Sequence, residues 1–519
     1  MKATKFVLFI FYSLITLSGY SQTYDLNLKV RTTEKVKSYK ESLKSNKIKK
    51  NNEINFLHLE QGTIESSMSF FNGYYLKDAE ENKYPITKNM YDGFELLHPD
   101  IQQFWDWQII SKVMYNLGKE GTQLDLRNEA EEEALECINR IQSNNGELKD
   151  PYLENYIYGL FAKIAPKRFL DGRPSNINIL IQQHPSVNAL TYPNGTIILT
   201  TGLLSVLHSE DELVAILAHE IAHFVLDHAI INVNKGVQRT KRAEFWSAVL
   251  TGVTAAVEVA AASKNSHYIP GAATASVAMF STLASKQILN RLGMEFNHEQ
   301  EEEADAIAVK ILQLLGYNEN ALSGALSRIA KHYFAERDMT PYVSTYTHPD
   351  LISRINNMGK YGDYPIDRSF EQTVSFAVTN TAIMKYYNRR FSQCLSLVTQ
   401  NIVNNVGTSD DYILKAKCLL ALENTPDSNT EVLNLIQKAK KLNTGTFINC
   451  YSTEIVAYLR LHDKTNAMNG LNQYIQQLNL IQDDLIKTRS SRYWDNMHSF
   501  VETETNWAKR MIVKLNGTL

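Results

Sequence analysis

The sequence has 519 residues, of which 44% are hydrophobic and 21% are charged, as is ordinary for globular proteins. This composition excludes a disordered chain, a collagen-like chain and a small disulfide scaffold. At roughly 150 residues per domain, the length predicts about three domains. Lys and Arg total 53 and Asp and Glu total 56, so the net charge is −3. Because there is no broad positive field to hold a phosphate backbone, nucleic acid is not an expected partner.

Residues 1–21 have the pattern of a secretory signal peptide. A basic start is followed by the apolar run Phe6–Leu17, and small residues stand just before Gln22, where cleavage is expected. The run covers about 12 residues, fewer than the roughly 20 that a helix needs to cross a bilayer. The sequence therefore predicts an exported protein that is periplasmic or associated with the cell envelope.

The four cysteines do not form a recognisable motif. They lie far apart and none belongs to a C-x-x-C pair, which argues against zinc ligation or a redox pair: Cys137, Cys394, Cys418 and Cys450. In an oxidising compartment, one disulfide among the last three remains an alternative to buried free thiols.

The N-terminal region, residues 22–145, has no predicted function. Within it, Lys29–Lys50 is rich in basic residues and poor in large apolar ones, so we expect a solvated linker there. Leucines and isoleucines at three- and four-residue spacing predict a helix over residues 151–165.

A small sheet is expected next. Isoleucines at every second position predict a strand over residues 177–181, and two further strand-like runs flank the turn Pro193–Gly195 as a hairpin. Ser209–Glu212 then has the S-x-x-E form of a capping box, which predicts the start of a helix.

That helix contains the main chemical motif of the chain. From Leu213 to Leu226 its only polar side chains are His219, Glu220 and His223. Residues four apart share one face of a helix, so both imidazoles can bind a single ion. Glu220 points elsewhere and is better placed beside a metal-bound water, as in the H-E-x-x-H zinc hydrolases. The alternative is a pair of core histidines satisfied by hydrogen bonds.

A catalytic zinc site needs a third protein ligand and one open position. His228 is near in sequence, but the motif with a third histidine requires it at position 229, which is Ala229. A second helix, opening at Glu301 and ending at Gly316, offers carboxylates instead. Glu301 and Asp305 share one face, so one can bind the metal while the other orients a ligand imidazole. Charge alone does not distinguish these ligands from a solvated acidic first turn.

With these motifs the chain resembles the HtpX, BepA-like and CAAX prenyl endopeptidase group of zinc metallopeptidases, over about residues 148–358. Five elements in order carry the resemblance: Asn188-Ala189 with Pro193-Asn194-Gly195, Gly202-Leu203-Leu204 with Asp211-Glu212-Leu213, His219-Glu220-Ile221-Ala222-His223, Glu301-Glu302-Glu303-Ala304-Asp305, and His348-Pro349 with Arg354. The resemblance assigns the third ligand to Glu301. It implies a zincin-like domain of residues 146–360 in a mainly α, α+β chain, with one Zn²⁺ per chain.

The resemblance also implies a mechanism. Glu220 takes the proton from a zinc-activated water that attacks a peptide carbonyl. His348 is expected to donate a hydrogen bond to that carbonyl or to approach the metal; a turn residue before a proline is its alternative role. Asp305 and Arg354 are expected to support the ligands.

Asn188 and Ala189 lie in a strand whose free edge can pair with an extended polypeptide substrate, although a purely structural edge is the alternative. Residues 245–285 are rich in small and apolar residues between the two metal elements. Glu258 and the shortness of the second half argue against spanning helices. We therefore expect packed helices there, or peripheral contact with a membrane.

Helical patterns fill the tail, residues 361–519. Leu422 is echoed by Leu461, 39 residues on, and Leu442 by Leu478, 36 residues on, near the lengths of two-helix solenoid repeats. A tetratricopeptide-like domain that binds a protein partner and an ordinary helical bundle are both consistent with this pattern.

Two functions follow. The first is an exported zinc metalloendopeptidase that hydrolyses envelope proteins, including misfolded or unassembled ones. The second is a zinc-stabilised chaperone or assembly factor that acts through its helical tail. Three convincing ligands favour the first, because structural zinc is normally closed by four.

Overall fold

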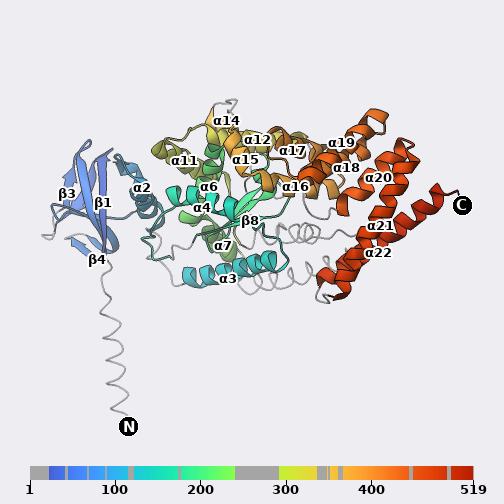
Figure 1. Ribbon diagram of the computed structural model, residues 1–519. Helices are drawn as coiled ribbons and strands as arrows, with labels where there is room; N and C mark the ends of the chain where they lie inside the picture. The colour runs from blue at the N-terminus through green and yellow to red at the C-terminus, as the bar shows by residue number, and fades with distance from the viewer. Residues whose placement is uncertain are drawn as a thin grey trace, which may run out of the picture. The chain divides into compact units, whose positions relative to one another are not determined.

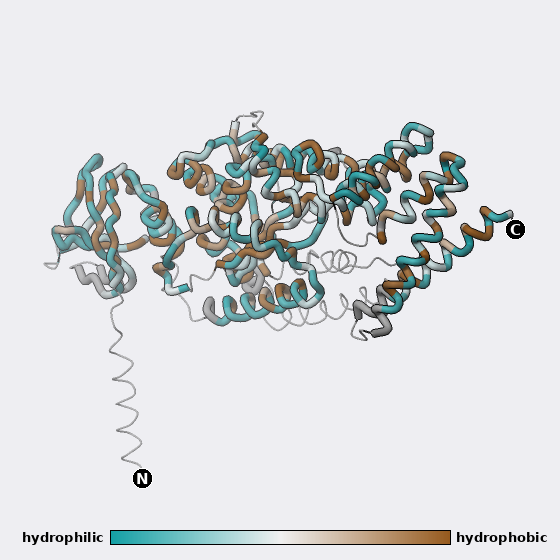
Figure 2. The backbone as a smooth tube through the Cα atoms, in the orientation of Figure 1, coloured by the Kyte–Doolittle hydropathy of each residue, from teal (hydrophilic) through white to brown (hydrophobic). Residues whose placement is uncertain are grey.

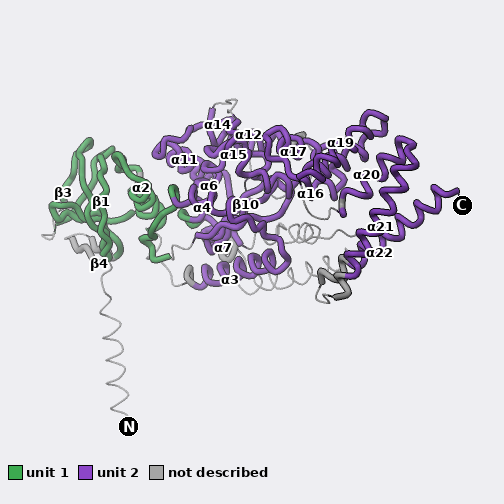
Figure 3. Tube along the Cα trace, in the orientation of Figure 1, with its two compact units in different colours: residues 1–123, 163–176, 225–227 green, residues 124–162, 177–224, 228–519 purple. Residues whose placement is uncertain are grey.

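A computed structural model describes residues 23–40, 45–66, 69–87, 90–114, 122–173, 177–239, 292–335, 348, 351–359, 366–442, 448–487 and 492–517. The chain divides into two compact units (Figure 3), and each is described by itself. Unit 1 comprises residues 1–123, 163–176 and 225–227, and unit 2 comprises residues 124–162, 177–224 and 228–519. The predicted signal peptide and the segment 245–285 lie outside the described residues.

Unit 1 contains a seven-stranded antiparallel sheet (Figure 1) in the order β3-β2-β6-β5-β4-β1-β7. Its core includes edge-to-face aromatic rings of Phe56, Tyr84, Phe94 and Trp107. Trp107 comes from α2 (Ile101–Gln108), which begins with a capping box of Asp100 and Gln103. The strands are β1 (Thr23–Thr32), β2 (Val36–Tyr39), β3 (Ser45–Ile48), β4 (Glu53–Ser66), β5 (Ser69–Asp78), β6 (Lys83–Pro85) and β7 (Phe94–Leu96).

The expectation of a linker at Lys29–Lys50 is wrong, because β1, β2 and β3 lie there. Along β1, Leu26, Leu28 and Val30 are buried, while Lys29 between them is exposed. The basic residues therefore occupy the outward positions of a two-residue alternation. Because they are so numerous, the segment has the composition of a linker although it forms strands.

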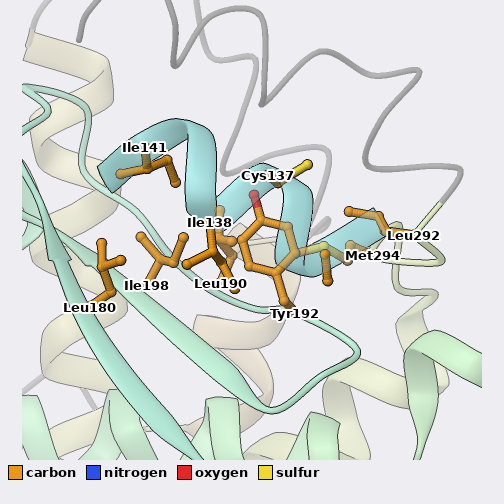
Figure 4. Close-up of a cluster of buried hydrophobic side chains, with 10 residues drawn as sticks. Cys137, Ile138, Ile141, Leu180, Leu190, Tyr192, Ile198, Leu292 and Met294 are labelled. Atoms are coloured by element: carbon orange, nitrogen blue, oxygen red, sulfur yellow. The ribbon is translucent and has the colours of Figure 1, made fainter. Parts of the chain in front are cut away.

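In unit 2, the small sheet follows its predicted pattern. Its strands are β8 (Asn178–Gln182), β9 (Ala189–Thr191) and β10 (Thr196–Thr200), in the order β8-β10-β9. β9 and β10 form the expected antiparallel hairpin, and Gly195 in its turn has φ 81°, which suits glycine. One face of the sheet packs against α3 (Thr122–Ser143), where Tyr192 and Leu190 meet Ile138 (Figure 4).

The metal helix, α6 (Glu210–Val225), is buried along most of its length, as its apolar composition predicts. Half of the expected capping box forms: the Glu212 N–H donates to Ser209 Oγ at 3.2 Å, while the Glu212 carboxylate accepts from the His208 N–H at 2.7 Å. The acidic helix, α11 (His298–Leu315), begins three residues before Glu301 with a capping box of Asn297 and Gln300. It ends at Gly316, where φ is 75°.

Further helices of the middle region complete the surroundings of α6 and α11. The helix expected from Pro151 is α4, which ends at Ile164. The others are α5 (Thr201–Leu204), α7 (His228–Arg239), α12 (Ala321–Ala335) and α14 (Leu351–Met358). The expected fold class, mainly helical with a small sheet beside the metal helix, is confirmed. The seven-stranded sheet of unit 1 was not expected.

The tail is helical, as expected. Successive helices pack as neighbours, and hydrophobic and hydrophilic residues are interspersed along them (Figure 2). α18 and α20 begin 39 residues apart, close to the predicted repeat, although the tetratricopeptide-like assignment stays a prediction. The helices are α15 (Arg368–Thr373), α16 (Ser375–Tyr387), α17 (Phe391–Val403), α18 (Ser409–Leu422), α19 (Pro426–Leu442), α20 (Ile448–Arg460), α21 (Lys464–Lys487) and α22 (Arg492–Leu515).

All four cysteines are buried free thiols. Among the described residues, no single helix has the length and apolar character to cross a bilayer. α6 and the start of α7, bent by 46° at their junction, reach that length and composition only as a pair.

Candidate metal centre

The helix α6 brings two imidazoles together. The Nε2 atoms of His219 and His223 lie 3.1 Å apart, and both side chains are almost fully buried. The four-residue spacing explains this convergence, because it places both residues on one face of a helix.

The helix α11 adds a carboxylate to this pair. Glu301 Oε1 lies 3.4 Å from His223 Nε2, and Glu301 Oε2 lies 3.5 Å from His219 Nε2. Glu301 is completely buried. Three side chains that the sequence predicts as ligands are therefore in one place, although 78 residues separate Glu301 from His223 in the chain.

His348 supplies a fourth donor atom. Its Nδ1 lies 3.0 Å from Glu301 Oε1 and 3.4 Å from His219 Nε2, and its Nε2 lies 3.3 Å from Glu220 Oε1. One atom from each of His219, His223, Glu301 and His348 falls within 4.8 Å of the others. The imidazole of His348 thus completes a ring of four side chains around one point.

Asp305 and Arg354 support these donors from behind. Asp305 Oδ1 lies 2.9 Å from His219 Nδ1, so the Nε2 of His219 is left facing the cluster. Arg354 donates from Nε and Nη2 to Asp305 at 2.8 and 2.6 Å, and its Nη1 lies 2.5 Å from Glu301 Oε2. Both residues therefore contact the proposed ligands.

The charges of the site favour a cation. Burial alone would raise the pKa of Glu301, but His348 and Arg354 outweigh it and hold that pKa well below its usual range. Burial lowers the pKa of His223, which leaves that imidazole neutral with a lone pair to offer.

The carboxylates of Glu220, Glu301 and Asp305 with the guanidinium of Arg354 sum to −2, and a proton on His348 would leave −1. Buried charge of this size is costly unless it is compensated. A divalent ion held by the four donors would compensate it, so the residues present fit a metal.

Thr191 is a residue that the sequence analysis missed. Its hydroxyl lies 2.7 Å from Glu220 Oε2, within β9, and is buried. A hydroxyl donated to one carboxylate oxygen fixes the direction of the other, which faces His348. The only sequence signal for this contact is that Thr191 shares a strand face with Ala189.

A cavity with about 490 Å³ of empty space, its mouth included, opens beside Glu220 and His219. Asn188 and Ala189 also line it, and most of its other lining side chains are aliphatic: Val187, Leu203, Ile216, Leu326, Ile329 and Leu351. Asn188 is 3% exposed, and among the described residues its Nδ2 has no hydrogen-bond partner. The cavity therefore presents largely apolar walls, with Asn188 Nδ2 as an unused donor and with His348 and Arg354 also lining it beside Glu220.

Known proteins resemble this part of the chain. Residues 151–361 match the model of peptidase family M48. The beta-barrel assembly-enhancing protease of Escherichia coli (strain K12) is 24% identical over 260 residues, which cover 50% of this chain and 49% of that protein.

Two further relatives match shorter regions. The beta-barrel assembly-enhancing protease of Yersinia pestis is 26% identical over 42% of this chain and 41% of its own length. The mitochondrial metalloendopeptidase OMA1 of Arabidopsis thaliana is 25% identical over 30% of this chain and 26% of its own length. The chain thus spans about half the length, or less, of the curated relatives described here. The motifs, the candidate metal centre and these matches agree, and residues 151–361 of the chain resemble peptidase family M48.

Proposed function

We propose that the protein is an exported zinc metalloendopeptidase that hydrolyses peptide bonds of envelope polypeptides, with Glu220 as the general base. The convergence of His219, His223 and Glu301 beside a buried glutamate carries the proposal. Such a site has the two parts that metal-assisted peptide hydrolysis needs, a set of ligands and a base.

Zinc is the metal that the donor types favour, and the spacing of the donors is compatible with it. Ligand atoms about 2.0 to 2.1 Å from a tetrahedral zinc ion are about 3.3 Å from one another. The Nε2 atoms of His219 and His223 lie 3.1 Å apart, and each lies 3.4 to 3.5 Å from a different oxygen of the Glu301 carboxylate. Two neutral imidazoles and a carboxylate are also the donor types found in catalytic zinc sites.

The side chains divide the chemistry between them. When bound, zinc would supply Lewis acidity, which makes a nearby water nucleophilic near neutral pH and polarises the scissile carbonyl. Glu220 accepts the proton of that water and passes it to the leaving amine, while Thr191 keeps the carboxylate in place. Asp305 keeps the proton of His219 on Nδ1.

His348 has two states in this proposal. In the arrangement described above, its Nδ1 lies among the proposed ligand atoms, where it would hold a bound zinc ion in the place of a catalytic water. Hydrolysis therefore requires this imidazole to withdraw. A short withdrawal leaves it beside Glu220 and within reach of the substrate carbonyl, where it donates a hydrogen bond.

The edge of β9 is the proposed substrate strand. Main-chain hydrogen bonds join Tyr192 to Thr196 and Thr200 to Asn188, so the N–H and C=O of Ala189, between them, point away from β10. Within the described residues, no further strand pairs with that edge. An extended polypeptide could pair there, donate a carbonyl to Asn188 Nδ2, and place an apolar side chain in the aliphatic cavity.

The location and the substrate class rest on other observations. Residues 1–21 have the pattern of a signal peptide, and two relatives are named beta-barrel assembly-enhancing proteases. Envelope polypeptides, including misfolded or unassembled ones, are therefore the substrates we propose.

The test compares Glu220→Gln with wild type in the full mature chain, using metal analysis and cleavage of labelled casein. We expect one equivalent of zinc in both proteins and no cleavage by the variant. Glu299→Gln, which changes an exposed carboxylate of α11, is the matched control and should cleave normally. Casein cleavage by Glu220→Gln at the wild-type rate would end the proposal.

A zinc-stabilised chaperone or assembly factor is the second candidate, because His348 brings the number of protein donors to four. Its tetratricopeptide-like tail would bind the protein partner. This candidate predicts that Glu220→Gln is silent, that deleting residues 361–519 abolishes function, and that His348→Ala weakens zinc binding strongly. The peptidase proposal predicts that His348→Ala keeps its zinc on the three remaining ligands.

A further inference from the structure

His228 is buried next to the metal centre but is not one of its four donors. The sequence analysis considered it as a third ligand and set it aside. In the structure its Nδ1 lies 2.9 Å from His223 Nδ1, and its Nε2 lies 3.2 Å from Glu303 Oε2. Glu303, His228 and His223 are thus linked by two successive contacts, and His223 is one of the proposed ligands.

We propose that His228 and Glu303 are positioning residues, which fix the tautomer and orientation of His223 so that its Nε2 binds the metal. The inference rests on the proposed metal site. In this proposal His228, which lies outside the H-E-x-x-H motif, increases metal affinity through its contact with His223.

The positions of the protons follow from the donors and acceptors. An ionised carboxylate can only accept, so the proton of neutral His228 lies on Nε2, facing Glu303. Nδ1 of His228 then has a lone pair and can only accept from His223 Nδ1–H. His223 is left with its lone pair on Nε2, which faces Glu301 at 3.4 Å. One carboxylate thereby sets the protonation of two imidazoles in series.

Packing fixes the ring of His223 as well. The ring of Phe296 stacks on it with centroids 3.8 Å apart and planes 19° apart. His228 itself is 2% exposed, and its main-chain oxygen accepts from Gln300 Nε2 at 3.4 Å. With its face covered and its Nδ1 engaged, the imidazole of His223 has little freedom to turn away from the metal.

Both ligand histidines are therefore held by the same helix. In α11, Glu301 is the ligand, Asp305 contacts His219 directly, and Glu303 reaches His223 through His228. Partners of this kind typically contribute 10- to 100-fold to metal affinity. An ordinary core histidine would contribute to folding without affecting zinc affinity, and this difference makes the role testable.

The experiment measures the zinc dissociation constant of the full mature chain, by competition with a chromophoric chelator, and the melting temperature of the metal-free protein. We expect His228→Ala to weaken zinc binding by about 10- to 100-fold. His228→Asn can place an amide oxygen near the former Nδ1 and should recover part of this loss. Glu303→Gln keeps an acceptor without its charge and should weaken binding less than His228→Ala.

The control for Glu303→Gln is Glu302→Gln. Glu302 is the adjacent residue, is half exposed and contacts His298 and Asn357. The Glu302→Gln protein should therefore bind zinc as tightly as wild type. Because Glu303 is one-third exposed, its variant tests the proposal even if His228→Ala does not fold.

Unchanged zinc affinity in both His228→Ala and Glu303→Gln would overturn the inference and leave the peptidase proposal intact. A wild-type chain that binds no zinc would overturn both. A lower melting temperature without weaker zinc binding would show that His228 serves only the fold.

Discussion

Among the residues that the structure describes, Arg354 is the one Lys or Arg paired with the carboxylates of the candidate metal centre, so its replacement tests how the site balances its charges. It is 2% exposed and contacts both Glu301 and Asp305. Arg354→Met keeps much of the side-chain volume and changes the charge of the metal-free site from −2 to −3. Removing one partner of a buried ion pair costs about 3 to 5 kcal/mol.

The expected result is a lower melting temperature of the metal-free protein. For a domain of 150 to 250 residues, each kcal/mol shifts the melting temperature by about 2 to 4 °C, so we expect a fall of about 6 to 20 °C. With zinc bound, the site of the variant carries a charge of −1 in place of −3. The difference in melting temperature between variant and wild type should therefore be smaller than in the metal-free proteins. Calorimetry of both forms, with and without zinc, measures the two shifts.

Two further variants sharpen this test. Arg140→Met removes a surface ion pair with Glu136 and should change stability by less than about 1 kcal/mol. Adding Asp305→Asn to Arg354→Met returns the buried charge to −2, so the double variant should recover part of the lost stability. A metal-free Arg354→Met protein that melts within about 2 °C of wild type would refute the charge balance described here.

The remaining predictions concern the metal, the base and the fold. Chelation of zinc from wild type should destabilise it by about 2.7 kcal/mol relative to protein with free zinc at 100 times its dissociation constant; unchanged melting with EDTA would argue against a resident ion. Glu301→Ala should lose its zinc, as measured by metal analysis of the purified protein. Thr191→Val should cut casein about tenfold more slowly with its zinc retained, because the Glu220 carboxylate loses a hydrogen bond; an equal rate would exclude this role. Gly202→Ala should lower the melting temperature, since its Cβ would lie 2.2 Å from the Ser186 main-chain oxygen.

The sequence by itself determined the local parts of this protein. A four-residue spacing placed His219 and His223 on one face of a buried helix, and a glycine marked the end of α11. Each of these features is set by hydrogen bonds and side chains within one or two helical turns. The choice of Glu301 among its acidic neighbours needed the family resemblance, since spacing alone left it open.

Only the tertiary structure decided the contacts between distant segments. It brought His348 Nδ1 to the metal centre across 129 residues and turned His228 toward His223 in place of the metal. It also paired β1 with β7 and β2 with β6, strands that lie far apart in the chain. Such contacts depend on how whole elements pack, and no periodicity within one segment encodes the direction of a side chain in another.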